Sequence, residues 1–304
     1  MTNQDDVKEF LSSRRARITP DQAGLPAYGG NRRVAGLRRE EVAMLAGMSV
    51  DYYNRLERGN LRGVSDAVLG SIARALHLDE AETSHLFDLA RAANTAPTKR
   101  RRSSPRGVRP SIQRMLDAMT DAPAWVRNAR HDFLAGNRLG FALYSEMFAD
   151  PVRPANSARF VFLDERSKEF FPDWERTADD IVAMLRSEAG VNPYDRDLSD
   201  LIGELSTRSE TFRTRWAAHH VRFHRTGIKR LHHPEVGDLE LSYEALELTS
   251  EPGLTFLAYT AEPNTPSADG LRLLASWAAT LDATALAAAP TRGAASAPAV
   301  PADG

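Results

Sequence analysis

Residues 37–58 read LRREEVAMLAGMSVDYYNRLER and carry two short amphipathic helical patterns that meet at one glycine. The apolar residues of the first pattern follow helical spacing and are Leu37, Val42, Leu45 and Ala46. Gly47 ends this pattern, because glycine tolerates the left-handed backbone that stops a helix. Two helices joined by such a turn are typical of a helix-turn-helix.

The second helix of this segment is expected to begin at Val50. Ser49, directly before it, is suited to cap the helix by accepting hydrogen bonds from its free amides. Helical spacing turns Tyr53 and Leu56 inward. The side chains that then point away from the core are Val50, Asp51, Tyr52, Asn54, Arg55 and Arg58. We expect this outward face to read a DNA groove.

A helical hairpin inside a larger all-helical domain would show the same local pattern, so the flanking sequence matters. Three further amphipathic helical patterns, at residues 7–17, 68–78 and 81–92, complete a compact five-helix unit. With Leu56-Glu57-Arg58-Gly59 closing the second helix, the unit resembles the xenobiotic-response-element family of bacterial repressors, which share the lambda-type helix-turn-helix.

The resemblance implies that the second helix enters the major groove with its N-terminal residues at base edges. Val50, Asp51 and Arg55 are then the expected base readers, with Tyr52 and Asn54 nearby. Arg55 would bind a guanine through two hydrogen bonds, worth about 1–3 kcal/mol of discrimination. Asp51 either accepts from a cytosine amino group or favours the positive end of its own helix.

Phosphate contacts, which set register without carrying sequence information, are expected from Ser49 and Arg58. Further arginines face DNA phosphate or are ordinary solvated side chains, and these are Arg32, Arg33, Arg38 and Arg39. Glu57 has a structural role in the family, where it pairs with an arginine of the first helix. The arginines available for that pair are Arg14, Arg15 and Arg17.

Composition limits the classes of protein to which this chain can belong. Its 304 residues predict more than one domain. With no signal-like segment and no run of about 18 apolar residues, we expect a cytoplasmic protein, nucleoid-associated when DNA-bound, with no membrane partner. The absence of cysteine excludes disulfides, iron-sulfur clusters and cysteine-ligated zinc.

Charge is divided unequally along the chain. Residues 1–109 hold 19 Lys and Arg against 13 Asp and Glu, a net charge of +6, whereas the rest holds 20 against 28, a net charge of −8. Only the first part suits a polyanion.

The sequence divides into a helix-turn-helix domain at 1–96, a basic Pro-containing linker at 97–110, a second domain at 111–284 and an Ala/Pro-rich tail at 285–304 that we expect to be disordered. The linker is either a solvated tether or a segment that lies near the duplex and adds salt-dependent affinity.

The second domain mixes the periods of strand and helix. Period-two segments predict strands at 124–128, 132–137, 227–233, 239–248 and 254–260. Helical periods occur at 139–147, 177–188, 198–207, 210–219 and 270–281. We therefore expect an α+β domain with one antiparallel sheet, helices on one face and an enclosed pocket.

This domain resembles the ligand-binding domain of MmyB-like transcription regulators, which is PAS-like. The resemblance is carried by Trp125, Asn128, Asn137, Arg159-Phe160-Val161-Phe162, the segment 209–221 and His233-Pro234-Glu235-Val236-Gly237. It implies a fatty-acid or acyl-type ligand.

The ligand-binding residues expected from the resemblance are Trp125, Asn128, Phe133, Asn137, Phe160, Phe162, Phe212, Arg213, Trp216 and His220. The aromatic residues among them would equally serve as plain core. A buried acyl carboxylate needs a positive or amide partner, and the candidates are Arg213, His220, Asn128 and Asn137.

Five of the eight histidines lie between 219 and 233: His219, His220, His224, His232 and His233. No Asp or Glu stands near them at a spacing typical of metal ligands, so we expect no metal and no other cofactor. We expect one or two of these histidines to line a pocket mouth or to form buried hydrogen bonds. The sequence also lacks the nucleophile elbow, the phosphate-binding loop and the His-Glu-x-x-His motif, and we expect no enzyme.

The sequence thus predicts a homodimeric, sequence-specific transcription regulator that binds a two-fold symmetric double-stranded operator and senses a small apolar ligand. The alternative is that the second domain binds a protein, such as an RNA polymerase subunit or a second regulator, or mediates dimerisation, without a small ligand.

Overall fold

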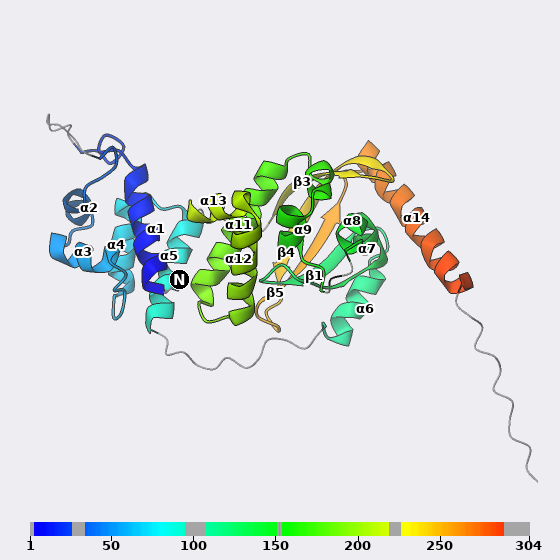
Figure 1. Ribbon diagram of the computed structural model, residues 1–304, viewed down its shortest axis with the longest axis horizontal. Coiled ribbons are helices and arrows are strands. Elements are labelled where there is room, and N and C mark those ends of the chain that lie inside the picture. Colours follow the sequence, from blue (N-terminus) through cyan, green and yellow to red (C-terminus); the bar gives the residue numbers. More distant parts are fainter. Residues whose placement is uncertain are drawn as a thin grey trace, which may run out of the picture.

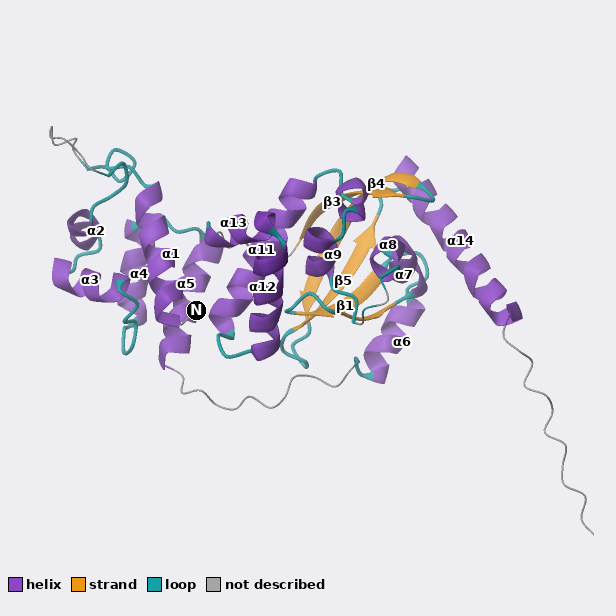
Figure 2. Cartoon of the chain, in the orientation of Figure 1, coloured by secondary structure: helices purple, strands orange, loops and turns teal. Residues whose placement is uncertain are grey.

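The computed structural model describes residues 3–25, 34–94, 107–150, 152, 154–218 and 226–288, with a helical region followed by an α+β domain (Figures 1 and 2). Several positions named above lie outside the described residues: Arg32, Arg33, residues 97–106 of the linker, His219, His220, His224 and the tail from residue 289.

The helical region contains the five predicted helices: α1 (Asn3–Arg17), α2 (Arg39–Leu45), α3 (Val50–Glu57), α4 (Asp66–Ala75) and α5 (Glu80–Asn94). One core joins them, with Phe10, Val42 and Leu56 among its buried side chains. The predicted buried stripe of α2 is wrong at one position, because Leu45 is 36% exposed. This short helix buries Val42, as predicted, together with Ala43.

The α+β domain is built on one antiparallel sheet with strand order β2-β1-β5-β4-β3. Its strands are β1 (Ala124–Asn128), β2 (Phe133–Gly136), β3 (Thr226–His233), β4 (Gly237–Glu247) and β5 (Leu254–Thr260). All five correspond to predicted strands. The central strand β5 pairs with β1, which stands about 130 residues earlier in the chain.

Nine described helices surround this sheet: α6 (Pro110–Ala118), α7 (Arg138–Leu143), α8 (Ser145–Phe148), α9 (Ser157–Leu163), α10 (Arg166–Phe170), α11 (Trp174–Val191), α12 (Arg196–Arg208), α13 (Glu210–Ala217) and α14 (Pro266–Ala288). The segment 139–147, predicted as one helix, is divided at Tyr144 into α7 and α8. Three short helices, α6, α9 and α10, were not predicted.

Helices cover both faces of the sheet, so the expectation of helices on one face alone is wrong. The larger core lies between the sheet and helices that include α7, α9, α11 and α14. On the opposite face, α6 packs Ile112 and Leu116 against Val126 and Phe256. Residues of one strand alternate between the two faces, which places Trp125 and Arg127 on the larger-core side.

The helical region and the α+β domain lie against each other through α5 and α11 (Figure 1). Among the described residues, no helix has the length and apolar character needed to cross a membrane.

Candidate functional site

The turn between α2 and α3 has the local structure that the sequence predicts. Gly47 adopts a φ of 68°, the left-handed conformation that ends α2. The Ser49 side chain accepts a hydrogen bond from the Tyr52 backbone amide, with N and Oγ 3.2 Å apart. Ser49 is therefore the N-cap of α3.

The predicted base-reading residues of α3 are accessible. Val50 is 42% exposed, and Asp51 and Arg55 are exposed as well. Tyr52 and Asn54 are half-buried, and the Arg55 guanidinium carbon lies 4.9 Å from the centroid of the Tyr52 ring. The chain thus presents a polar, cationic helix face to solvent.

Glu57 anchors α3 from the inside of the helical region. Its buried carboxylate lies 2.9 Å from Nη2 of Arg15 and 3.1 Å from Nη2 of Arg39. Burial raises the pKa of Glu57, but hydrogen bonds from the two arginines outweigh it and leave the pKa below its ordinary value. The predicted pair with an arginine of the first helix is therefore confirmed for Arg15.

The other arginines of this region have different surroundings. Arg14 and Arg17 pair with Glu82 rather than with Glu57. Arg39, which was expected to contact phosphate, donates hydrogen bonds to the Glu57 carboxylate and is partly exposed. Arg38 precedes α2 with an exposed side chain, and Arg58 is exposed at the end of α3. Arg38 and Arg58 therefore remain accessible to a phosphate.

The α+β domain contains a partly open cavity of about 60 Å³ between the sheet and helices α8 to α11. Its lining combines aromatic, apolar and ionisable side chains: Trp125, Arg127, His131, Phe133, Tyr144, Met147, Ser157, Val161, Phe171, Thr177, Asp180, Ile181, Met184, Lys229, Leu257 and Tyr259.

Two cationic side chains reach this cavity from different strands. Arg127 on β1 shares a sheet face with Trp125, and Lys229 on β3 shares it with Leu231. Lys229 Nζ donates to Thr177 Oγ1 at 2.8 Å and lies 4.8 Å from the centroid of the Phe171 ring. An Arg127 Nη2 lies 3.4 Å from the Met184 sulfur.

Neither cation forms an ion pair with any carboxylate of the described residues. Burial lowers the pKa of Lys229 to about 8, and the carboxylate of Asp180, which also lines the cavity, opposes this shift by electrostatic attraction. Burial lowers the pKa of Arg127 as well. Two desolvated positive groups in one small cavity favour an anion.

Further polar groups complete the cavity wall. His131 Nδ1 and Ser157 Oγ are 3.1 Å apart, and the hydroxyl oxygens of Tyr144 and Tyr259 are 3.3 Å apart. Trp125 stacks on Tyr259 with ring centroids 4.6 Å apart. The wall thus offers hydrogen-bonding groups beside aromatic surface.

The structure brings only some of the predicted ligand residues together. Trp125 and Phe133 line the cavity. Four other predicted aromatic residues pack elsewhere in the larger core: Phe160, Phe162, Phe212 and Trp216.

The predicted polar ligand residues have other surroundings. Asn128 stabilises the β1–β2 turn by hydrogen bonds with Asp132. Asn137 caps α7 and also forms hydrogen bonds with the backbone around residues 119–124. Arg213 is exposed outside the cavity lining, and His220 lies outside the described residues.

Two histidines of the predicted cluster are described. His233 is buried, with Nε2 3.0 Å from the Ala142 carbonyl oxygen and Nδ1 accepting from the Glu235 amide. His232 pairs with Asp238 at the surface. The described part of the chain contains no cluster of three residues able to hold a metal ion.

Sequence reasoning missed Arg127 and Lys229 although a signal existed. In strand 226–233, period-two spacing places Lys229 on the same face as Leu231 and His233, and in 124–128 it places Arg127 with Trp125. A charged residue at an inward position of a strand is the signal.

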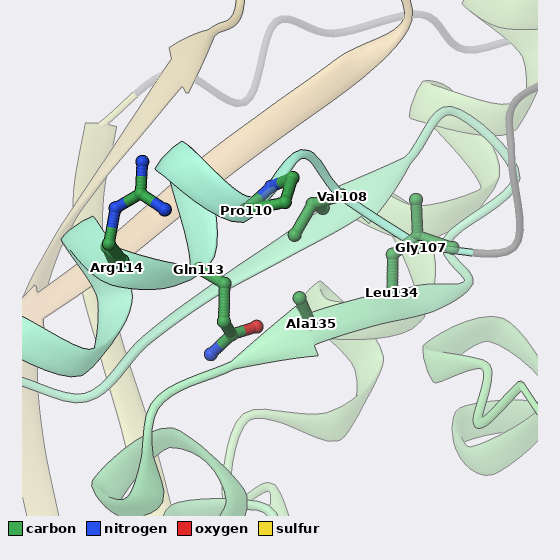
Figure 3. Close-up of a pocket in the computed structure, with 7 residues that line it drawn as sticks. All are labelled: Gly107, Val108, Pro110, Gln113, Arg114, Leu134 and Ala135. Carbon is green, nitrogen blue, oxygen red and sulfur yellow. The ribbon is translucent and has the colours of Figure 1, made fainter.

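A second hollow, of about 490 Å³ and widely open to solvent, lies on the outer side of the domain (Figure 3). The start of α6 and strand β2 form it, with the side chains of Gln113, Arg114 and Leu134 at its wall. Arg114 is exposed, so this hollow lacks the desolvated charges of the smaller cavity.

Two protein-family models match the chain. The MmyB-like transcription regulator ligand binding domain matches residues 108–274, and a helix-turn-helix domain matches residues 14–86. No curated protein matches the chain.

Proposed function

The chain belongs to the MmyB-like transcription regulators, and we propose that it acts as a homodimer that reads a two-fold symmetric operator and senses an acyl ligand. It is a DNA-binding transcription regulator with a ligand-binding domain, from a family of regulators and not of enzymes. Because a DNA-binding regulator acts where its operator lies, we infer that it acts in the cytoplasm, on the nucleoid.

The accessible face of α3 supports the DNA-reading part of the proposal. Arg55 would leave the Tyr52 ring and bind a guanine through two hydrogen bonds, worth about 1–3 kcal/mol. Arg58 would contact phosphate. One five-helix region reads only a few base pairs, so a dimer with half-sites roughly 34 Å apart supplies the remaining specificity.

The DNA-reading face is tested on an operator selected from random duplexes, by gel shift with excess nonspecific duplex. Arg55→Ala is expected to weaken operator binding by about 5- to 150-fold, the equivalent of 1–3 kcal/mol. Arg58→Ala is expected to weaken binding to every duplex and to lower its salt dependence. If Arg55→Ala binds the operator as tightly as the wild type, α3 is not the reading helix.

The pair of half-buried cations without an ion-pair partner among the described residues carries the ligand part of the proposal. An acyl carboxylate placed against Arg127 and Lys229 would form the ion pairs that neither cation has among the described residues, and would balance the excess of two cations over the single carboxylate of Asp180 in the lining. The Thr177 hydroxyl, which already accepts from Lys229, lies beside that position. The ligand is therefore an acid whose charged head enters the cavity and whose apolar part faces the aromatic wall.

The acyl tail requires movement of the cavity wall. A volume of about 60 Å³ compares with about 30 Å³ for one water molecule, so an acyl chain displaces side chains as it enters. Met147 and Met184 line the cavity, and unbranched thioethers adapt readily to a new shape.

The ligand is tested first by denaturing purified protein and analysing the extract for acids by mass spectrometry, then by calorimetric titration with octanoate. Octanol, which has the same tail without the charge, is the matched ligand control. Lys229→Met and Arg127→Met are expected to lose octanoate binding, whereas Arg213→Met, outside the cavity, keeps it. No acid in repeated extracts and no octanoate binding would favour a protein-binding or dimerisation role for the domain.

A further inference from the structure

Helix α11 contacts the ligand cavity and the DNA-binding region with opposite faces. Thr177, Ile181 and Met184 line the cavity. Residues of an α-helix advance by about 100° each, so Arg186, nine residues after Thr177, points half a turn away. Arg186 and Gly190 occupy this second face, which packs on α1 and α5.

Gly190 lies at a tight contact between the two parts. A Cβ atom added at this position would lie 2.5 Å from Cε1 of His85 on α5, a distance that real side chains do not reach. His85 is buried and packs edge-on against Phe10 of α1, with ring centroids 5.0 Å apart. The backbone of α11 is therefore fitted directly to the core of the helical region.

Arg186 adds a buried electrostatic contact to the same face. Its guanidinium lies 3.9 Å from the centroid of the Trp216 ring, donates to the Trp216 carbonyl oxygen, and has Nη1 3.9 Å from Oδ1 of Asp6 on α1. The side chain is almost fully buried. A desolvated contact of this kind is expected to be either closed or open, because intermediate geometries leave the charge unpaired.

Helix α1 continues from this contact to the reading helix. Asp6 lies near its first end and Arg15 near its last, and Arg15 holds Glu57 at the end of α3. The cavity, α11, α1 and α3 thus form one continuous series of packed elements.

We propose that docking of α11 on α1 and α5 is the switch that couples the cavity to the DNA-reading helix. The inference rests on the proposed ligand function for its input, but the docking itself is testable without ligand. A ligand that displaces Ile181 or Met184 shifts α11, opens the contact at Gly190 and Arg186, and changes the position of α3 within the dimer.

The first test is a wedge variant with a matched control. Gly190→Leu forces α11 away from His85, whereas Gly203→Leu places the same side chain on α12, where an added Cβ meets nothing within 4 Å. Spin labels on cysteines at Ala67 and Asp200, both exposed, report the separation, since the chain has no cysteine of its own. We expect longer, broader distances for Gly190→Leu and unchanged ones for Gly203→Leu.

The second test is operator affinity without any acid present. Gly190→Leu is expected to change it by at least about fivefold, the lower end of ordinary coupling between sites, and Gly203→Leu by less than twofold. Asp6→Asn, compared with its exposed neighbour Asp5→Asn, is the milder pair if the leucine variant folds poorly. Wild-type distances or wild-type operator affinity in both interface variants would overturn the proposal.

Adding octanoate to the wild type separates this inference from the ligand proposal. Octanoate that binds and lengthens the label distance supports the switch, and octanoate that binds without changing distance or operator affinity overturns it. Failure of octanoate to bind contradicts only the ligand class, because the two ligand-free comparisons still decide the docking switch.

Discussion

Two arginines of the helical region and two cations of the α+β domain have opposite surroundings. Arg14 and Arg15 each meet a buried carboxylate, at 3.0 Å from Glu82 and 2.9 Å from Glu57. Arg127 and Lys229 meet a thioether, a hydroxyl and an aromatic face instead. A buried charge that is paired with an opposite charge has a structural role in the fold. A desolvated charge without such a partner indicates a site that a ligand completes.

The largest expected effect on stability comes from removing the buried carboxylate of Glu57. Glu57→Gln leaves Arg15 and Arg39 without their carboxylate, and breaking such a buried pair is expected to lower the free energy of unfolding by about 3 kcal/mol. Denaturant unfolding followed by circular dichroism measures the change.

The control for this variant is Glu40→Gln, which removes an exposed carboxylate paired with Arg38. Surface pairs contribute about 0–1 kcal/mol, so little change is expected. Equal losses in the two variants would contradict the structural role assigned to Glu57.

Removing the unpaired charge of Lys229 is expected to stabilise the protein, in contrast to removing Glu57. Lys229→Met removes a desolvated ammonium and fills its place with apolar volume, which is expected to raise the free energy of unfolding by about 1 kcal/mol while abolishing octanoate binding. Unfolding and calorimetric titration of the same samples test both statements.

Lys168→Met on α10 serves as the comparison, because Lys168 is exposed and paired only with the exposed Glu165. It is expected to change neither quantity. If Lys229→Met destabilised the protein as much as Glu57→Gln, Lys229 would have a structural role in stabilising the fold.

A dependence of stability on pH is also expected. Burial lowers the pKa of Lys229 to about 8 in the folded protein, against 10.5 for an ordinary lysine. The penalty for burying its charge is fully present below pH 8 and is relieved as the pH rises from 8 to 10.5, so stability contributed by this group increases over that range.

Octanoate affinity is expected to show the opposite trend, because the carboxylate needs protonated Lys229. It should fall about tenfold between pH 7 and pH 9. In Lys229→Arg the affinity should stay level over this range, since arginine does not lose its proton there. A wild-type affinity that is equally level would mean that Lys229 does not contact the acid.

Local patterns predicted the helical region closely. The five helices, the cap at Ser49 and the turn at Gly47 all depend on residues near one another in sequence, whereas the partnership of Glu57 with the first helix was expected from the family resemblance. The five strands were found for the same reason, since alternation along a strand is visible without knowledge of its neighbours.

The ligand-binding residues were less accessible to the same reasoning. The aromatic residues of segment 209–221 fill the core beside α11 and α12, and the Asn137 side chain caps α7. Nothing local distinguishes an aromatic residue that fills a core from one that lines a cavity.

The sequence by itself therefore determined the helix-turn-helix, the strand and main helix segments, and the basic and acidic parts of the chain, because each is written in short-range periodicity or composition. Only the tertiary structure decided that α6 covers the far face of the sheet, that Arg127 and Lys229 meet at one cavity, and that Gly190 docks on His85. These features depend on pairing between β1 and β5 and on packing between α5 and α11, which bring together residues about 100 or more positions apart. No local pattern encodes such distances, since they follow from the topology of the folded chain.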